Sequence, residues 1–127
     1  MKLKDYFEGT KGISVLSTSD NKGEVDSAIY SRPHVLDNGN IAFIMADKLS
    51  HSNLQKNPKA CFLFKEDGPG YKGKRLYLLK ISETQNKEEV DRLRRAHRCK
   101  NDDDEGKVRF LVTFSITKEL PLVGSNI

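Results

Sequence analysis

Short runs of alternating apolar and polar positions occupy most of the chain, and this spacing is typical of half-buried β-strands. Strands are expected over residues 12–18, 24–32, 33–37, 40–46, 60–64, 75–85 and 108–117. Asn38-Gly39, between the third and fourth of these runs, is the strongest hairpin signal in the sequence. Pro33 has no backbone N–H, so the second run ends there or lies at a sheet edge.

Three segments between the strands are predicted to be helical. They cover residues 3–8, residues from about 50 to 57, and residues 86–99. In the third segment Val90, Leu93 and Ala96 share one face. In the second, Ser50 or Ser52 is expected to accept hydrogen bonds from the free N–H groups of the first turn. Residues 119–122 are expected to form an irregular tail.

The order of the elements predicts the fold class. Strands and helices do not alternate regularly along the chain, as parallel βαβ units would require. A mainly β fold is therefore expected, an antiparallel β-barrel with short helices. A length of 127 residues fits a single domain, residues 1–127. With 36% hydrophobic and 31% charged residues, the core is modest, and a homodimer would add burial.

The sequence carries no signal for a membrane or a secretory pathway. It lacks a run of about 20 apolar residues and an apolar leader, so a cytoplasmic protein without a membrane partner is expected. The histidines and cysteines do not have the spacing of a zinc site, and no metal is expected. No motif of a catalytic nucleophile is present, and the catalytic residues are unknown.

The net charge of +4 is distributed unevenly. Residues 72–75 and 92–100 are basic, and residues 101–105 are mainly acidic. With Tyr71 and Tyr77 nearby, a small basic β-barrel that binds nucleic acid is one alternative function. The aromatic residues do not form a row on one strand, so no nucleic-acid partner is expected. A haem-handling barrel, with His97 as ligand, is a third and weaker hypothesis.

Two segments have the composition of a phosphate site. Residues 47–53 lead from a strand into a helix N-terminus and offer N–H groups, hydroxyls and Lys48 to an anion. An ordinary capped helix explains the same residues. Residues 67–75 combine glycines and cations with Tyr71, and a flexible basic hairpin loop explains that composition equally well.

Four segments in sequence order resemble the pyridoxamine 5′-phosphate oxidase-like family of FMN-binding split barrels. Lys48-Leu-Ser-His-Ser-Asn-Leu-Gln-Lys-Asn-Pro58 resembles the helix motif Ser-x-Lys-x-x-Asn-Leu-x-x-Asn-Pro of that family. The other matching segments are residues 12–18, residues 25–33 with 41–45, and residues 110–124. Together the four segments extend over nearly the whole chain.

The resemblance implies an antiparallel Greek-key split barrel that binds FMN at the two-fold interface of a homodimer. It places Ser27, Ala28 and Ile29 against the isoalloxazine ring and Lys48, Leu49 and Ser50 at the phosphate, while Tyr71, Lys74 or Arg75 completes the site from either subunit.

The resemblance also implies a flavin-dependent oxidoreductase or electron-transfer protein, with a small-molecule or protein redox partner that remains unknown. The arginine-rich second strand and the C-terminal arginine and histidine motif of the oxidase are absent. The lysine that is common in the helix motif falls on Ser50. Oxidation of pyridoxamine phosphate is therefore not implied.

Overall fold

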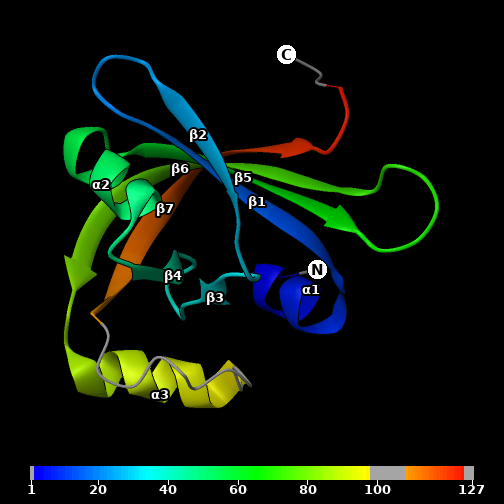
Figure 1. The fold of residues 1–127 in the computed structure, drawn as a ribbon. Helices are drawn as coiled ribbons and strands as arrows, with labels where there is room; N and C mark the ends of the chain where they lie inside the picture. The colour runs from blue at the N-terminus through cyan, green and yellow to red at the C-terminus, as the bar shows by residue number, and fades with distance from the viewer. Residues whose placement is uncertain (1, 98–107, 125–127) are drawn as a thin grey trace.

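A computed structural model of the protein describes residues 2–97 and 108–124, and Figure 1 shows their fold. Seven strands and three short helices lie in this part of the chain. In chain order they are α1 (Leu3–Gly9), β1 (Gly12–Ser19), β2 (Val25–Ile29), β3 (His34–Val35), β4 (Ile41–Ala46), α2 (Leu49–Lys56), β5 (Lys59–Glu66), β6 (Gly73–Thr84), α3 (Lys87–His97) and β7 (Arg109–Pro121).

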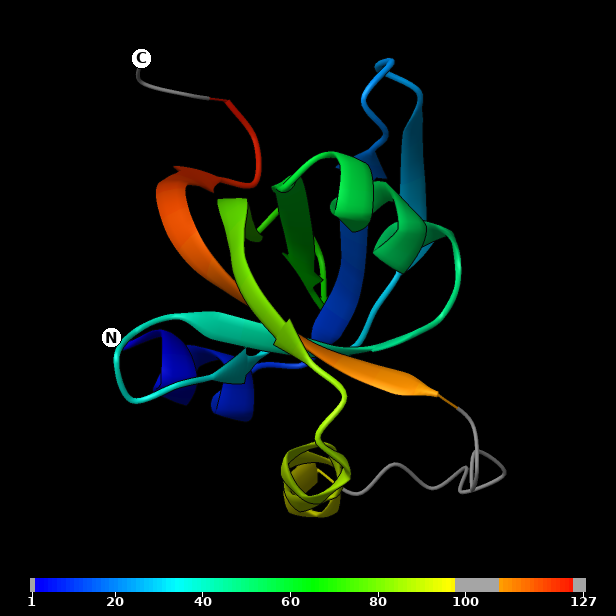
Figure 2. The same cartoon turned by 90° about the vertical axis from the view of Figure 1, so that its left-hand side faces the viewer.

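All seven strands form one antiparallel sheet in the order β2-β1-β5-β6-β7-β4-β3. The two edge strands, β2 and β3, are not paired with each other, so the coiled sheet forms a split barrel. Helix α2 contacts β1 and β2 as well as β4, and it therefore bridges the split (Figure 2). The predicted mainly β, antiparallel barrel is confirmed.

Phenylalanine rings fill the interior of the barrel. Alternate residues of each strand point inward, as in β1, where Ser14, Leu16 and Thr18 are buried. The rings of Phe43 and Phe62 have centroids 5.2 Å apart. The other buried members of this core are Phe7, Ile41, Met45, Leu54, Phe64, Leu76, Leu78, Phe110, Val112 and Phe114.

A second, smaller apolar cluster lies outside the barrel. Val90 and Leu93 of α3 pack there with Ala42 and Leu111, as the predicted apolar face of this helix requires. The predicted helix extends to Cys99, but residues 98–107 and the side chains of residues 94–97 lie outside the description. The acidic run 101–105 and most of the basic run 92–100 are therefore not compared with the structure.

The hairpin at Asn38-Gly39 is confirmed, with a loop of three residues. The backbone N–H of Leu36 donates to the carbonyl of Asn40 (2.8 Å), and the N–H of Gly39 donates to the carbonyl of Leu36 (3.0 Å). Gly39 has a φ of 90°, a conformation that glycine adopts without steric cost. Strand β3 consists of His34 and Val35 only and is shorter than the predicted run 33–37.

The largest differences from the expected strand ends are at the ends of β7 and β2. β7 continues to Pro121 and pairs with β6, so the tail predicted at 119–122 is wrong for most of its length. Proline is tolerated because it occupies the last strand position. β2 ends at Ile29 rather than at residue 32, because Arg32 turns toward α1 and donates to the carbonyls of Phe7 (2.6 Å) and Thr10 (2.7 Å).

The start of α2 also requires a correction. The helix begins at Leu49, its N-cap residue is Lys48, and no side chain caps it. Ser50 lies inside the first turn and is buried, so the predicted cap by Ser50 or Ser52 is wrong. The first turn therefore keeps N–H groups that no capping side chain satisfies.

Candidate functional site

A pocket of about 390 Å³ opens where the barrel splits, between β2 and β4 and beside the first turn of α2. This volume is within the range of small-molecule sites. The residues that line the pocket are Asp26, Ala28, Ile29, Tyr30, Ile44, Ala46, Lys48, Leu49, Ser50 and Arg109. The pocket exists because α2 bridges two strands that do not pair with each other.

The wall from β2 follows the alternation of that strand. Asp26 and Ala28 are half-buried, and Ile29 at the rim is 67% exposed. Tyr30 packs edge-on against Phe43, with ring centroids 5.8 Å apart. Burial raises the pKa of the Tyr30 phenol, although a hydrogen bond with Ser50 opposes the shift. Tyr30 is therefore neutral at physiological pH and connects β2 to the first turn of α2.

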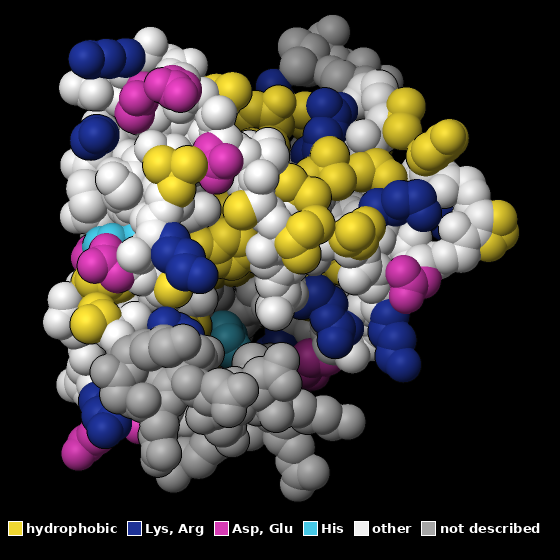
Figure 3. Space-filling view, in the orientation of Figure 1, with side chains coloured by type: hydrophobic (Ala, Val, Ile, Leu, Met, Phe, Trp, Pro, Cys, Tyr) yellow, Lys and Arg dark blue, Asp and Glu magenta, His cyan; other side chains and the backbone are white. Residues whose placement is uncertain are grey.

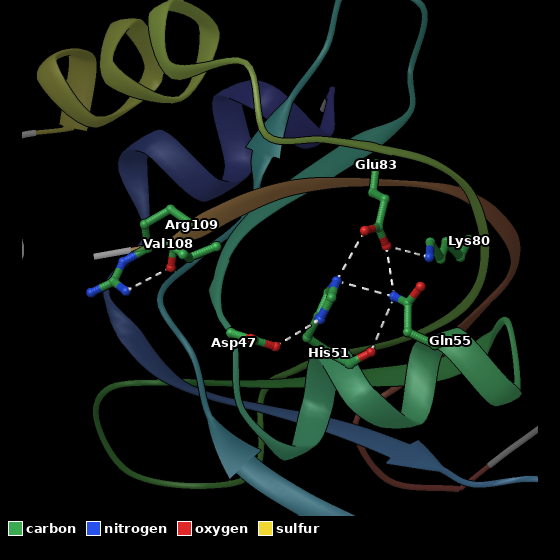
Figure 4. A network of polar contacts seen from close by, with 7 residues as sticks. All are labelled: Asp47, His51, Gln55, Lys80, Glu83, Val108 and Arg109. Atoms are coloured by element: carbon green, nitrogen blue, oxygen red, sulfur yellow. Dashed lines mark hydrogen bonds and ion pairs between the residues drawn. The ribbon is translucent and has the colours of Figure 1, made fainter. Parts of the chain in front are cut away.

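The opposite side of the pocket is suited to an anion. The uncapped N-terminus of α2 carries free N–H groups and the positive end of the helix dipole. Lys48 adds a cation from the same turn, and Arg109 adds a second from β7. The guanidinium of Arg109 donates to the carbonyl of Val108 (3.2 Å), as Figure 4 shows. This donor set matches the negative charge of a phosphate monoester.

A polar network surrounds the side chain of His51, in the first turn of α2 (Figure 4). The Nε2 atom of His51 lies 3.0 Å from Oε2 of Glu83, and its Nδ1 atom lies 3.5 Å from Oδ1 of Asp47. Gln55 and Lys80 donate to Oε1 of Glu83 at 2.7 Å and 2.5 Å. Partial burial raises the pKa of Glu83, but hydrogen bonds from Lys80, His51 and Gln55 outweigh it and lower the pKa to about 2.

Five of the predicted site residues line the pocket: Ala28, Ile29, Lys48, Leu49 and Ser50. Ser27 is not part of the lining. Its hydroxyl contacts that of Ser17 (2.9 Å), on the neighbouring strand β1. By the alternation of the strand, Ser27 and Ile29 point to the face opposite Ala28, and of these two only Ile29, the last residue of β2, reaches the pocket.

The three predicted loop residues lie elsewhere in the chain. Tyr71 is 77% exposed in the β5–β6 loop, which projects away from α2 (Figure 1). Lys74 lies 4.9 Å from the ring centroid of Tyr6, and Arg75 donates to the carbonyls of Pro121 and Gly124 at the end of β7. One chain does not bring these residues to the pocket. Their contribution from a second subunit stays a prediction.

Half of the pocket lining was not predicted from the sequence: Asp26, Tyr30, Ile44, Ala46 and Arg109. The alternation of β2 could have indicated Asp26 and Tyr30, which share the face of Ala28. Arg109 had no local signal. It reaches the pocket because β4 and β7 pair with Ala46 opposite Arg109.

The pocket residues are compatible with a phosphorylated aromatic ligand such as FMN. The cations and the helix N-terminus lie at one end, while Ile29, Ile44 and Leu49 provide apolar surface for a ring system. Groups of His, Cys, Asp and Glu that could hold a metal ion are not found in residues 2–97 and 108–124. In the same residues no helix is long and apolar enough to cross a membrane.

Solved structures with a similar fold support this description. An FMN-binding protein from Syntrophomonas wolfei subsp. wolfei has a TM-score of 0.75 and 24% identity, with 97% of this chain and 85% of that chain covered. An F420 reductase has a TM-score of 0.71 and 13% identity, with 94% and 97% covered. A Listeria innocua protein provisionally assigned as a pyridoxamine 5′-phosphate oxidase has a TM-score of 0.65 and 13% identity, with 91% of each chain covered.

At these identities the similarity establishes the fold. The chain has the split-barrel fold of pyridoxamine 5′-phosphate oxidase-like proteins, as its sequence motifs predicted. Comparison of the sequence with known protein families and with curated proteins gives no match.

Proposed function

We propose that the protein binds FMN in the pocket at the split and acts, as a homodimer, as a flavin-dependent oxidoreductase or electron-transfer protein. The observation that carries the proposal is the pocket itself. Residues predicted for the ring and for the phosphate, from β2 and α2, line one cavity, and Arg109 adds a further cation. The FMN-binding protein with the same fold supports the choice of ligand.

Different pocket residues would contact different parts of the cofactor. Lys48, Arg109 and the first turn of α2 would bind the phosphate. Ile29 and Leu49 would contact the ring, and the neutral Tyr30 would keep this wall packed against the core. Bound flavin would supply the redox chemistry, and the protein would supply position and electrostatics. The structure assigns no side chain as a general acid or base.

The homodimer is proposed to form through the outer face of the sheet. Four of its side chains, Val15, Ile29, Leu63 and Cys61, lie beside one another by strand register. Ile29 is 67% exposed, and Figure 3 shows hydrophobic side chains gathered over the centre of this face. Exposed apolar patches of this kind mark interaction surfaces. Ile29 also lines the pocket, so a second copy on this face would cover the pocket rim.

A charge placed on this face tests the dimer. We expect the wild-type protein to be a dimer by light scattering at micromolar concentration. Val15→Lys should yield a monomer, because a two-fold interface brings the introduced charges close together. The control Ile81→Lys alters an exposed residue at a β-bulge of β6 and should stay dimeric. A monomeric wild-type protein with FMN fully bound would contradict the proposal.

The same dimer allows the β5–β6 loop of a second copy to complete the site, as the family resemblance implies. Lys74→Ala tests this contribution. It should weaken FMN binding in the dimer if the loop reaches the pocket across the interface, and it should have no effect in the monomeric Val15→Lys background. If Lys74→Ala leaves the affinity for FMN unchanged in both backgrounds, Lys74 is not part of the site.

The cofactor is tested on the purified protein. We expect the yellow absorption of an oxidised flavin, or reconstitution with one FMN per chain. Titrations followed by flavin fluorescence should give tighter binding for FMN than for riboflavin, because only FMN carries the phosphate. A protein that binds neither flavin at micromolar concentration would contradict the proposed function. Activity with candidate electron donors and acceptors should be measured after the cofactor has been established.

A further inference from the structure

The network of His51, Gln55, Lys80 and Glu83, with Asp47 at its edge, is called here the His51 network. It lies outside the pocket, since none of its members lines the cavity. His51 nevertheless directly follows Ser50, which lines the pocket. His51 itself is buried, with 7% of its surface exposed. A buried histidine with three polar side-chain neighbours, Asp47, Gln55 and Glu83, constrains the backbone on which it lies.

A ring contact connects the network to the second cation of the pocket. The imidazole of His51 stacks on the ring of Phe110, with centroids 3.7 Å apart and planes inclined by 12°. Phe110 directly follows Arg109, just as His51 closely follows Lys48. The stacked pair therefore joins the two backbone segments that present cations to the anion end of the pocket.

The charge of Glu83 determines which nitrogen of His51 carries a proton. A carboxylate with a pKa near 2 is ionised at physiological pH and can only accept hydrogen bonds. The amide nitrogen of Gln55 also lies 3.0 Å from Nε2 of His51, but it donates its two hydrogens to Glu83 (2.7 Å) and to the carbonyl of His51 (3.2 Å). The Nε2 atom of His51, 3.0 Å from Oε2 of Glu83, is therefore the donor to that carboxylate. Nδ1 then faces Asp47, at the side of the ring that leads toward Lys48. In this tautomer Nδ1 is an acceptor and cannot donate to the Asp47 carboxylate, so the bond to Glu83 and the stack on Phe110 orient the neutral ring.

We propose that Glu83 and His51 are positioning residues of the phosphate site: Glu83 fixes the Nε2–H tautomer and orientation of His51, and the stack of His51 on Phe110 holds Lys48 and Arg109 at the spacing that one phosphate requires. This inference rests on the proposed FMN binding. It adds residues that touch neither the cofactor nor the pocket. Their effect should therefore concern the phosphate and not the flavin ring.

The test is Glu83→Gln, which keeps the size of the side chain and removes its charge. The matched control is Glu8→Gln, which removes the charge of an exposed carboxylate on α1, away from the proposed site. Glu83→Gln should raise the dissociation constant for FMN about tenfold, an effect typical of residues that orient ligand-binding groups. The dissociation constant for riboflavin should change less than about twofold, and the control should alter neither value.

A spectroscopic readout separates positioning from a general loss of stability. In ¹⁵N NMR of the flavin-free wild-type protein, His51 should be in the Nε2–H tautomer, and Glu83→Gln should remove this preference. An Nδ1–H tautomer in the wild-type protein would overturn the inference without any variant. His51→Phe keeps a ring for stacking but lacks the donor, and it should weaken FMN as Glu83→Gln does.

The outcomes distinguish this inference from the proposed function. If the wild-type protein binds neither flavin, the proposed function fails and the inference fails with it. If the wild-type protein binds FMN and Glu83→Gln binds it equally well, only the inference fails. Equal losses of FMN and riboflavin affinity would also overturn it, because the network would then support the whole pocket.

Discussion

Strand β6 carries a polar cluster at each end, and the two clusters are built from similar groups. At its start, Tyr6 donates to Glu66 (2.6 Å), and Lys74 lies over the Tyr6 ring and 3.6 Å from Glu119; these four residues are called the Tyr6 cluster. At its end lies the His51 network. Each cluster joins a helix to the sheet through an aromatic ring, a lysine and a carboxylate.

The surroundings of the two clusters differ. The Tyr6 cluster fastens α1 over the closed part of the barrel, where Gly73 leaves no space for a Cβ against the carbonyl of Phe64. Burial and the bond to Glu66 raise the pKa of the Tyr6 phenol, so Tyr6 stays protonated and donates to Glu66. The His51 network adjoins the split, where the sheet edges separate and a cavity forms. Similar chemistry therefore supports the closed barrel at one end and adjoins the pocket at the other.

The largest expected effect concerns the stability of the closed end. Phe7→Ala removes a ring that is 3% exposed and packs against Phe62 and Phe64, so the free energy of unfolding should fall by about 3 kcal/mol. Urea denaturation followed by circular dichroism measures this change. The folded protein should keep its affinity for FMN. Val123→Ala, at a site 63% exposed, should change stability by less than about 0.5 kcal/mol.

The next largest effect concerns the affinity for FMN at the split of the barrel, called here the open end, where the pocket lies. Lys48→Ala removes a cation from the anion end of the pocket, which should cost about 2 kcal/mol of FMN binding, or more than tenfold in affinity. Riboflavin affinity should be unchanged. Lys4→Ala, at an exposed position of α1, should change neither value. Equal losses of FMN and riboflavin affinity would show that Lys48 acts through folding.

Lowering the pH should reduce the free energy of unfolding, because Glu83 in the His51 network becomes protonated. Its pKa is lowered from 4.5 to about 2 in the folded protein, so the ionised form stabilises the fold above pH 4.5. This contribution, about 1 kcal/mol after allowance for the partial exposure of the group, is lost as pH falls from 4.5 toward 2. Glu83→Gln should have a flatter profile of unfolding free energy over that window. A profile parallel to that of the wild-type protein would contradict this assignment.

The smallest effect is expected for Tyr6→Phe. The substitution keeps the ring between Phe7 and Phe64 and removes only the hydrogen bond to Glu66. Because Glu66 can be rehydrated, stability should fall by only about 0.5–1 kcal/mol. Thermal melting measures the change. Flavin affinity should not respond, and a marked loss of FMN binding would show that the two ends of β6 are coupled.

Local patterns were sufficient for most of the fold. The period-two runs identified the strands, and Asn38-Gly39 identified the hairpin, because both signals depend on neighbouring residues. The local composition at the start of α2 also indicated residues that the structure places in the pocket, Lys48, Leu49 and Ser50, and phosphate binding there stays a prediction. The expected serine cap was wrong because the helix begins at Leu49, which places Ser50 inside the first turn, where it is buried.

The composition of the site was decided by contacts between distant segments. Pairing of β4 with β7 brings Arg109 to the pocket, and the packing of α2 against β7 stacks His51 on Phe110. The β5–β6 loop, which has the glycines and cations of a phosphate loop, projects away from the pocket of its own chain. A sequence motif records which groups are available locally, whereas strand pairing and helix packing determine which of them share a cavity.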